Sequence, residues 1–136
     1  DDLVQRLRRH PLRDERVSFL GCIDDEQLAW SYQHAFVALA PSIYDGLGVP
    51  VAEALHHGCA TIASHGGAQP EAAGDAAELF DPDELDGLVE LLRRHLDDPE
   101  HHRAARAAAA MHRSPTWADT AAVIAGSIRQ LSGQDT

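Results

Sequence analysis

The sequence predicts an α/β fold, in which an open parallel sheet with flanking helices is followed by a helical C-terminal segment. Three observations support this prediction. Apolar runs of strand length alternate with helical patterns over about the first 80 residues. Strand patterns then stop, and helix starts follow one another toward the end of the chain. The length of 136 residues fits a single domain, residues 1–136, with a core of its own.

Four strands are expected in the first part of the chain. The run AFVALA is apolar throughout, which is typical of a central parallel strand covered on both faces. CATIAS is interpreted as a second buried strand, and Gly21 closes the strand VSFL. The predicted strands are residues 17–20, 35–40, 59–64 and 77–80.

Helices are expected before and between these strands. Asp24 with Gln27 three residues later is a helix-start signature, because each side chain can bind the other's backbone N–H. Pro50 stands where a first helical residue belongs, and Gly58 follows the end of that helix. The expected helices are a short stripe formed by Leu3, Val4 and Leu7, then residues 24–33 and 50–57.

Three further predicted helix starts toward the C-terminus share one sequence pattern, a capping side chain followed by proline. They are Asp81–Pro82, Asp98–Pro99 and Ser114–Pro115. The first and the last of these helices carry apolar stripes, formed by Leu85, Leu88, Val89, Leu92 and Leu96 and by Trp117, Ala121, Ile124, Ile128 and Leu131. We interpret the two tryptophans, Trp30 and Trp117, as core residues because both lie on helical stripes.

The composition excludes several classes of protein. The 22 acidic residues outnumber 11 basic ones, all of them Arg, so the net charge of −11 repels nucleic acid and anionic membranes. No apolar run reaches the length of about 20 residues that spans a bilayer, and the charged start DDLVQRLRRH is unlike a signal peptide. Cys22 and Cys59 are interpreted as reduced, buried thiols of a cytosolic protein.

Histidines are abundant, yet their spacing argues against a metal site. His56–His57 and His101–His102 are adjacent pairs, and neighbours on a helix point about 100° apart. The zinc motif with histidines four apart on a helix is absent from the sequence. We therefore interpret these histidines as helix-surface residues and expect no metal.

The loop with the clearest chemical pattern is PSIYDGLG, residues 41–48, between a predicted strand and a predicted helix. Ligands of open α/β sheets bind at the carboxyl ends of the strands, where this loop lies. Gly46 and Gly48 let main-chain N–H groups approach a ligand, and the helix at Pro50 adds its dipole. These features favour a diphosphate or another anion.

Two carboxylates flank this loop, Asp45 within it and Glu53 in what we expect to be the first helical turn. Carboxylates accept hydrogen bonds in pairs, which suits the vicinal hydroxyls of a ribose or a hexose. An alternative stays open, because two glycines also make an ordinary tight turn and an acid near a helix start also complements the dipole.

From Val17 onward the chain resembles the second half of the donor-binding domain of family 4 (group 1) retaining glycosyltransferases, which have the GT-B fold. Four segments carry the resemblance: VSFLGCIDDEQLAWSY, PSIYDGLGVPVAEAL with the family's E-x7-E pattern, GCATIASHGGAQPEAAGDAAELFDPDE, and SPTWADTA. The resemblance implies a Rossmann-like domain that is one part of a two-domain enzyme, preceded by an N-terminal acceptor domain that this chain lacks.

The resemblance also implies roles for individual residues. Asp45 matches the first acid, usually Glu, which contacts the donor sugar near the reacting centre and is the catalytic candidate. Glu53 matches the acid that binds the nucleotide ribose. The remaining donor-binding candidates are Gly46, Leu47 (usually aromatic), Gly48 and Val49, whose loop meets the diphosphate, and Gly21, Cys22 and Ile23 near the base.

The implied reaction is transfer of a sugar from a nucleoside-diphosphate sugar to an acceptor hydroxyl with retention, in bacterial glycan or glycolipid synthesis. No cofactor is expected, and the acceptor glycan or glycolipid would reach the site through the N-terminal domain. The basic Arg–Lys pair that neutralises the leaving diphosphate also lies upstream in the family. The implied location is cytoplasmic, with peripheral inner-membrane association through the missing domain.

A second hypothesis treats the chain as a non-catalytic nucleotide-binding or interaction module. Asp45 is one methylene shorter than the family's acid, and the chain by itself holds half of a donor site. An isolated chain is expected to be inactive and to self-associate through open sheet edges or its last helix.

Overall fold

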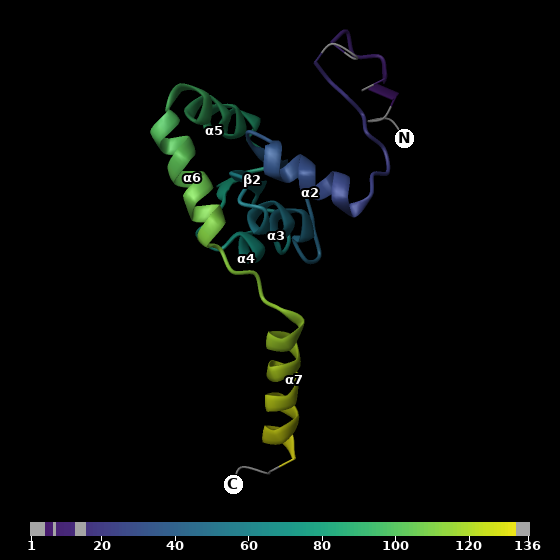
Figure 1. Ribbon diagram of the computed structural model, residues 1–136, viewed down its shortest axis with the longest axis vertical. Coiled ribbons are helices and arrows are strands. Elements are labelled where there is room, and N and C mark those ends of the chain that lie inside the picture. The colour runs from purple at the N-terminus through teal and green to yellow at the C-terminus, as the bar shows by residue number, and fades with distance from the viewer. Residues whose placement is uncertain (1–4, 7, 13–15, 133–136) are drawn as a thin grey trace. The chain divides into compact units, whose positions relative to one another are not determined.

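The computed structural model describes residues 5–6, 8–12 and 16–132 of the chain. These residues fall into two compact units that part after Ser31, and we describe each unit by itself (Figure 1). The predicted helical stripe of Leu3, Val4 and Leu7 lies outside the described residues.

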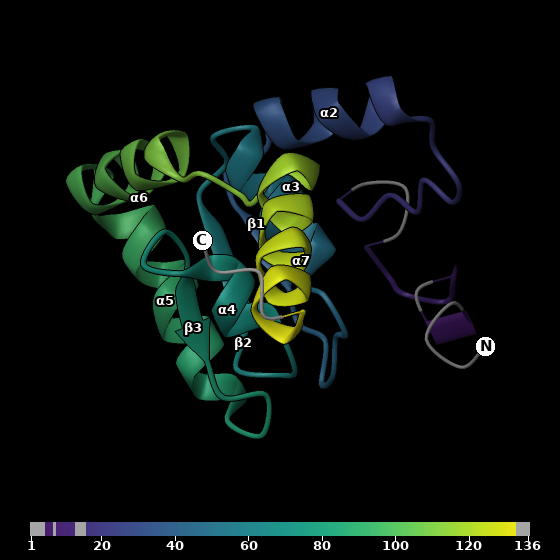
Figure 2. The same ribbon diagram turned by 90° about the horizontal axis from the view of Figure 1, so that it is seen from below.

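The sheet belongs to the second unit and has three parallel strands in the order β1–β2–β3. They are β1 (Ala38–Ala40), β2 (Thr61–Ser64) and β3 (Glu78–Phe80). Leu39 pairs with Ile62 across β1 and β2, and Ile62 pairs with Glu78 across β2 and β3. Figure 2 shows the strands side by side. Every residue of β2 is buried, which confirms the predicted parallel α/β sheet and its buried central strand.

Helices connect and follow these strands in the predicted alternation. They are α2 (Asp25–His34), α3 (Val49–His56), α4 (Gln69–Ala73), α5 (Leu85–Asp97), α6 (Pro99–Met111) and α7 (Trp117–Leu131). The core of the second unit is rich in alanine, and its buried members include Val51, Leu55 and Ala63. Small side chains let α3 and α4 approach the thin sheet closely, and α6 packs against α3 and α5. No helix within the described ranges is long and apolar enough to cross a membrane.

The predicted strand at residues 17–20 is wrong. Residue 17 makes one isolated bridge, and residues 18–20 form no ladder. Phe19 and Leu20 are exposed, so this run has the apolar residues of a strand without a neighbouring strand to satisfy its backbone. The predicted strand at 35–40 is correspondingly shortened to its last three residues, which pair with β2.

Two of the predicted helix starts are confirmed in atomic detail. The N–H of Gln27 donates to Asp24 Oδ1 over 2.8 Å, and the N–H of Asp24 donates to Gln27 Oε1 over 3.2 Å. Asp98 caps α6 by accepting hydrogen bonds from the N–H groups of Glu100 and His101.

The other two starts were placed too early. Asp81 accepts the N–H of Asp83 in a turn, and α5 begins only at Leu85. Thr116, and not Ser114, caps α7 through a capping box with Asp119. Asp81, beside its proline, stabilises a turn that precedes α5, whereas Ser114 Oγ is buried and makes no hydrogen bond in the described part of the chain.

The predicted apolar stripes are only partly buried. On α5, Leu88 and Leu92 turn inward beside the fully buried His95, while Leu85, Val89 and Leu96 stay exposed. The face of α5 that packs against the rest of the second unit is therefore rotated about the helix axis relative to the predicted apolar stripe.

The stripe of α7 contains no buried residue. Trp117 is 89% exposed and Trp30 is 61% exposed, so the interpretation of both tryptophans as core residues is wrong. Cys22 is also exposed, against expectation, whereas Cys59 is buried and its burial raises the pKa of its thiol.

Candidate functional site

The predicted binding loop, residues 41–48, leaves the carboxyl end of β1 and leads into α3. Gly48 is the residue before the helix, and its φ of +65° lies in the left-handed region that favours glycine. A Cβ at Gly48 would lie 2.6 Å from the Cβ of Ala72 on α4. Glycine at this position therefore allows both the left-handed turn and the close packing of α3 on α4.

A second glycine loop, which leaves the carboxyl end of β2, packs against the first. The N–H of Ala68 donates to the carbonyl oxygen of Asp45 over 2.8 Å. Gly67 has a φ of +58°, and a Cβ there would overlap the backbone of Asp45. The two loops thus support each other at the edge of the sheet where ligands of this fold class bind.

A buried polar network joins the same two loops. Ser64 Oγ donates to the carbonyl oxygen of Ser42, and Gln69 Nε2 donates to that oxygen over 2.9 Å and to Ser64 Oγ over 2.8 Å. The N–H of Gly66 in turn donates to Ser64 Oγ over 3.2 Å. Buried bonds of this kind fix the loop backbone in position before any ligand arrives.

Asp45 points back into its own loop. Its Oδ1 accepts hydrogen bonds from the N–H groups of Leu47, over 3.0 Å, and Gly48, over 2.6 Å. These two bonds lower the pKa of the carboxyl below its ordinary value, so the group is ionised at neutral pH. The candidate catalytic acid is therefore engaged with amides that were expected to meet the diphosphate.

Glu53 lies in the second turn of α3, because that helix begins at Val49. The helix begins one residue earlier than expected, so Glu53 is its fifth residue and lies just beyond the expected first turn. The hydroxyl of Tyr32, from α2, donates to Glu53 Oε2 over 3.5 Å. Burial raises the pKa of Tyr32, and the charge of Glu53 raises it further. Sequence reasoning missed Tyr32, whose only signal was an aromatic residue in a polar helix.

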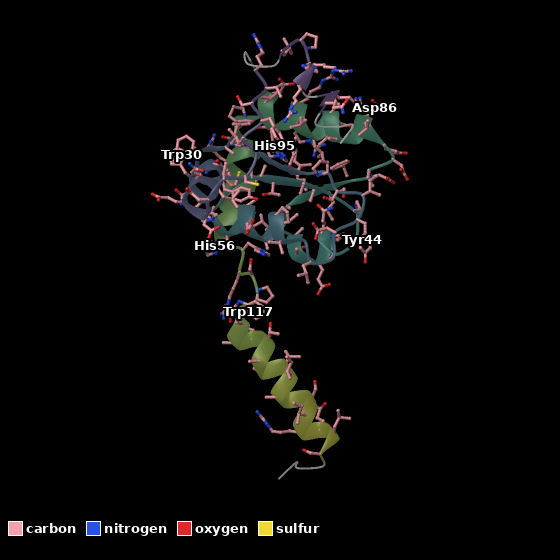
Figure 3. The ribbon with its side chains drawn as sticks, turned by 90° about the vertical axis from the view of Figure 1, so that its right-hand side faces the viewer. Trp30, Tyr44, His56, Asp86, His95 and Trp117 are labelled. Atoms are coloured by element: carbon pink, nitrogen blue, oxygen red, sulfur yellow. The ribbon has the colours of Figure 1, made fainter. Side chains whose placement is uncertain are left out.

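The outer part of the loop faces solvent. Leu47 is 77% exposed, and Gly46 and Val49 are exposed beside it. Tyr44 also lies at the surface (Figure 3). Gly46 and Leu47 line an open cavity of about 340 Å³ with Ala68 and Glu71. The structure therefore brings together Asp45, Gly46, Leu47, Gly48 and Val49, with Glu53 one helical turn further on.

Gly21, Cys22 and Ile23 belong to the first unit. Gly21 has a φ of +68°, and Cys22 and Ile23 line, with Trp30, a cavity of about 690 Å³ within that unit. The structure places these predicted base-binding residues together within the first unit.

The interpretation of His101 and His102 as helix-surface residues is wrong. Both are half-buried on α6, and His101 Nε2 lies 3.1 Å from Glu78 Oε2. His95 from α5 reaches the same oxygen. Sequence analysis missed this cluster because its members come from three separate elements, and no regular spacing connects them.

Taken together, the fold and the loops define a parallel α/β protein with a candidate ligand site built from glycine loops at the carboxyl ends of its strands. Comparison with protein families gives the particular class. The model of the glycosyl transferases group 1 family matches residues 4–112. The chain belongs to this family.

Curated relatives agree with this assignment. The chain is 31% identical over 107 residues to O-antigen chain mannosyltransferase B of Escherichia coli, covering 79% of this chain and 28% of that protein. It is 34% identical over 113 residues to the MMP alpha-(1->4)-mannosyltransferase of Mycolicibacterium hassiacum, covering 74% and 28%. The chain therefore spans less than a third of the length of these relatives.

A solved structure supports the same fold. The sucrose-phosphate synthase of Thermosynechococcus elongatus superimposes with a TM-score of 0.69 at 28% sequence identity. The match covers 97% of this chain and 33% of that protein. The Rossmann-like, GT-B donor-domain fold expected from the sequence is confirmed.

Proposed function

We propose that this chain is the donor-binding part of a retaining glycosyltransferase that uses a nucleoside-diphosphate sugar. The observation that carries the proposal is the rigid pair of glycine loops at the carboxyl ends of β1 and β2, in a chain of this family. Mannose is the first candidate for the transferred sugar, because several of its relatives are mannosyltransferases.

In this proposal the backbone binds the diphosphate. At the start of α3 Pro50 has no N–H and the N–H of Val51 donates to the carbonyl oxygen of Gly48, so the N–H groups of Gly48 and Val49 are the ones that would face a diphosphate. Together with the helix dipole they would stabilise the charge that develops on the leaving diphosphate. Glu53 would accept hydrogen bonds from the ribose hydroxyls, and Tyr32 would hold its carboxylate in place.

The role of Asp45 requires an exchange of partners. Its carboxylate holds the N–H groups of Leu47 and Gly48 in the structure. When diphosphate oxygens accept those N–H groups, the carboxylate is released toward the sugar. The acceptor hydroxyl would then attack the face that the diphosphate leaves, through an oxocarbenium-like state. Acceptor binding and the basic residues for the leaving group would come from the remainder of the enzyme.

The second hypothesis, a non-catalytic nucleotide-binding module, is favoured by the same contact. If Asp45 never leaves the two amides, it acts only as a cap of the loop. The isosteric variant Asp45→Asn separates the two functions, because its amide oxygen still accepts hydrogen bonds but carries no charge.

Calorimetric titration with UDP, GDP and ADP and their sugars tests the proposal in the enzyme that contains this chain. We expect saturable binding of one nucleotide family and sugar transfer that is lost in Asp45→Asn with binding retained. Binding without any transfer by the parent enzyme would establish the second hypothesis instead. A cytoplasmic location with peripheral membrane association through a further domain belongs to the first proposal and is tested by fractionation of cells.

A further inference from the structure

Two histidines and one glutamate converge where β3, α5 and α6 meet. His95 Nε2 lies 2.7 Å from Glu78 Oε2, and His101 Nε2 lies 3.1 Å from the same oxygen. One ligand atom from each of the three residues lies within 4.8 Å of the other two. Glu78 opens β3, so the cluster lies toward the amino ends of the strands, opposite to the end that carries the glycine loops.

His95 is the central member, because it is buried inside the molecule and only 1% of its surface is exposed (Figure 3). Its Nε2 is close to Glu78 Oε2 but makes no hydrogen bond in the described structure, since an N–H there would not aim at the oxygen. A buried polar atom without a partner destabilises the fold unless something satisfies it.

The contact made by the other ring nitrogen of His95 explains how its imidazole ring is oriented. His95 Nδ1 lies 3.1 Å from His102 Nδ1, so a single proton joins the two nitrogens. His102 is held in place by stacking on Phe36, with ring centroids 3.9 Å apart. When His95 donates that proton, its Nε2 carries a lone pair and lies beside a carboxylate oxygen without aiming at it. Two such acceptors 2.7 Å apart repel each other unless a cation lies between them.

We propose that Glu78, His95 and His101 form a binding site for a divalent transition-metal ion, with Zn²⁺ as the first candidate. Two imidazoles and one carboxylate are a known three-ligand set for zinc, and water would complete the tetrahedron. Zn–N and Zn–O bonds of about 2.0–2.2 Å place tetrahedral ligands about 3.3 Å apart. The distances from Glu78 Oε2 to His95 Nε2 and His101 Nε2, 2.7 Å and 3.1 Å, would therefore lengthen by about 0.6 Å and 0.2 Å on binding the ion.

The surroundings provide the supporting contacts that metal sites require. A metal-bound histidine almost always donates its other N–H to a fixed acceptor, which His102 supplies to His95. Arg94 Nη1 lies 4.0 Å from Glu78 Oε1, which leaves Oε2 for the ion. An open cavity of about 200 Å³, lined in part by Asp75, Glu78 and His101, gives the ion a route from solvent.

The position of the site defines its role. Its three ligands come from β3, α5 and α6, so a bound ion would fasten the two helices to the edge of the sheet. The site lies away from the glycine loops and is independent of the proposed transferase function. Zinc would therefore raise stability without taking part in sugar transfer.

The test is a titration of the chelator-treated full chain with Zn²⁺, and with Co²⁺ as a spectroscopic probe. We expect one equivalent of either ion to bind, with the intense visible absorption of four-coordinate Co²⁺. We also expect Zn²⁺ to raise the melting temperature. His101→Asn removes one ligand from a half-exposed position and should weaken binding at least tenfold, whereas His56→Asn, on the exposed surface of α3, should leave the affinity unchanged.

Equal zinc affinity of the original chain and His101→Asn, or no rise in melting temperature with zinc, would overturn the proposal. Such results would identify the cluster as an ion pair between a protonated His95 and Glu78. If His101→Asn does not fold by circular dichroism, the isosteric Glu78→Gln replaces it, with the same two outcomes.

Discussion

The side chain of Asp45 accepts a hydrogen bond of 2.6 Å from the backbone N–H of Gly48, the residue before α3. The carboxylate of Asp45 and the loop amides of Leu47 and Gly48 are thus hydrogen-bond partners. Any ligand that takes these amides must also displace the carboxylate. In the proposed function, donor binding and the position of Asp45 would therefore be coupled through these two hydrogen bonds.

The first prediction concerns the pH dependence of this contact. Because the bonds from Leu47 and Gly48 lower the pKa of Asp45 in the folded state, their stabilising effect is complete above the ordinary carboxyl pKa of about 3.9. The effect is lost as the pH falls through the lower, folded value. We expect the amide NMR signals of Leu47 and Gly48 to titrate below about pH 3.9, and a loss of this titration in Asp45→Ala. Signals that stay constant in the acid range would contradict the contact.

The second prediction is that Asp45→Glu keeps the fold and retains or increases sugar transfer. The adjacent Gly46 leaves open space, because a Cβ there would meet nothing within 4 Å. A longer side chain can therefore extend without overpacking. The measurement is the initial rate of transfer by the parent enzyme. Complete loss of transfer in a folded variant would show that the shorter acid is matched to this site.

The third prediction concerns Glu53. We expect Glu53→Ala in the parent enzyme to weaken binding of the nucleotide sugar by about 1.5–3 kcal/mol, because charge-assisted hydrogen bonds to the ribose are lost. Calorimetry measures the affinity, and Glu90→Ala, which removes an exposed acid from α5, is the control. If Glu53→Ala binds the nucleotide sugar with unchanged affinity, Glu53 does not bind the ribose.

Much of the fold could be predicted because it depends on local patterns. The all-apolar run before the loop marks β1, and proline after Asp98 marks the start of α6. The strand at 17–20 could not be excluded in this way, since a strand also needs a neighbour and residues 17–20 do not reveal one. The rotation of α5 has a similar cause, because His95 is buried among residues of other elements, Glu78 on β3 and His102 on α6.

The candidate site was predictable to a similar extent. The glycine pattern correctly located the loop, because left-handed backbone at Gly48 is a local requirement. The carboxylate of Asp45 can accept hydrogen bonds from the amides of its own loop or from a bound ligand. The sequence does not indicate which of these two partners it prefers. The contact of Tyr32 with Glu53 joins residues 21 positions apart and has no sequence pattern.

The fourth prediction is that the isolated chain self-associates through α7. Apolar side chains such as Ile124, Ile128 and Leu131 are exposed on this helix, and exposed apolar patches favour association. We expect light scattering to show species larger than a monomer, and the double variant Ile124→Ser with Ile128→Ser to reduce them. A monodisperse monomer for the unmodified chain would rule this out.

The fifth prediction tests the support that the second glycine loop gives to the first. In Gly67→Ala the new Cβ would overlap the backbone of Asp45, and a φ of +58° is unfavourable for alanine by about 1–2 kcal/mol. We therefore expect the free energy of unfolding to fall by at least this amount. Donor affinity should fall as well, because the loop that carries Asp45 must shift.

Gly46→Ala is the matched control for Gly67→Ala. A Cβ at this position meets nothing within 4 Å, and its φ lies outside the left-handed range. Its free energy of unfolding should stay the same or rise by up to about 1 kcal/mol, because alanine restricts the unfolded chain. Chemical denaturation measures both variants. If the two substitutions have equal effects on stability and on donor affinity, the packing of the two glycine loops does not hold the site in place.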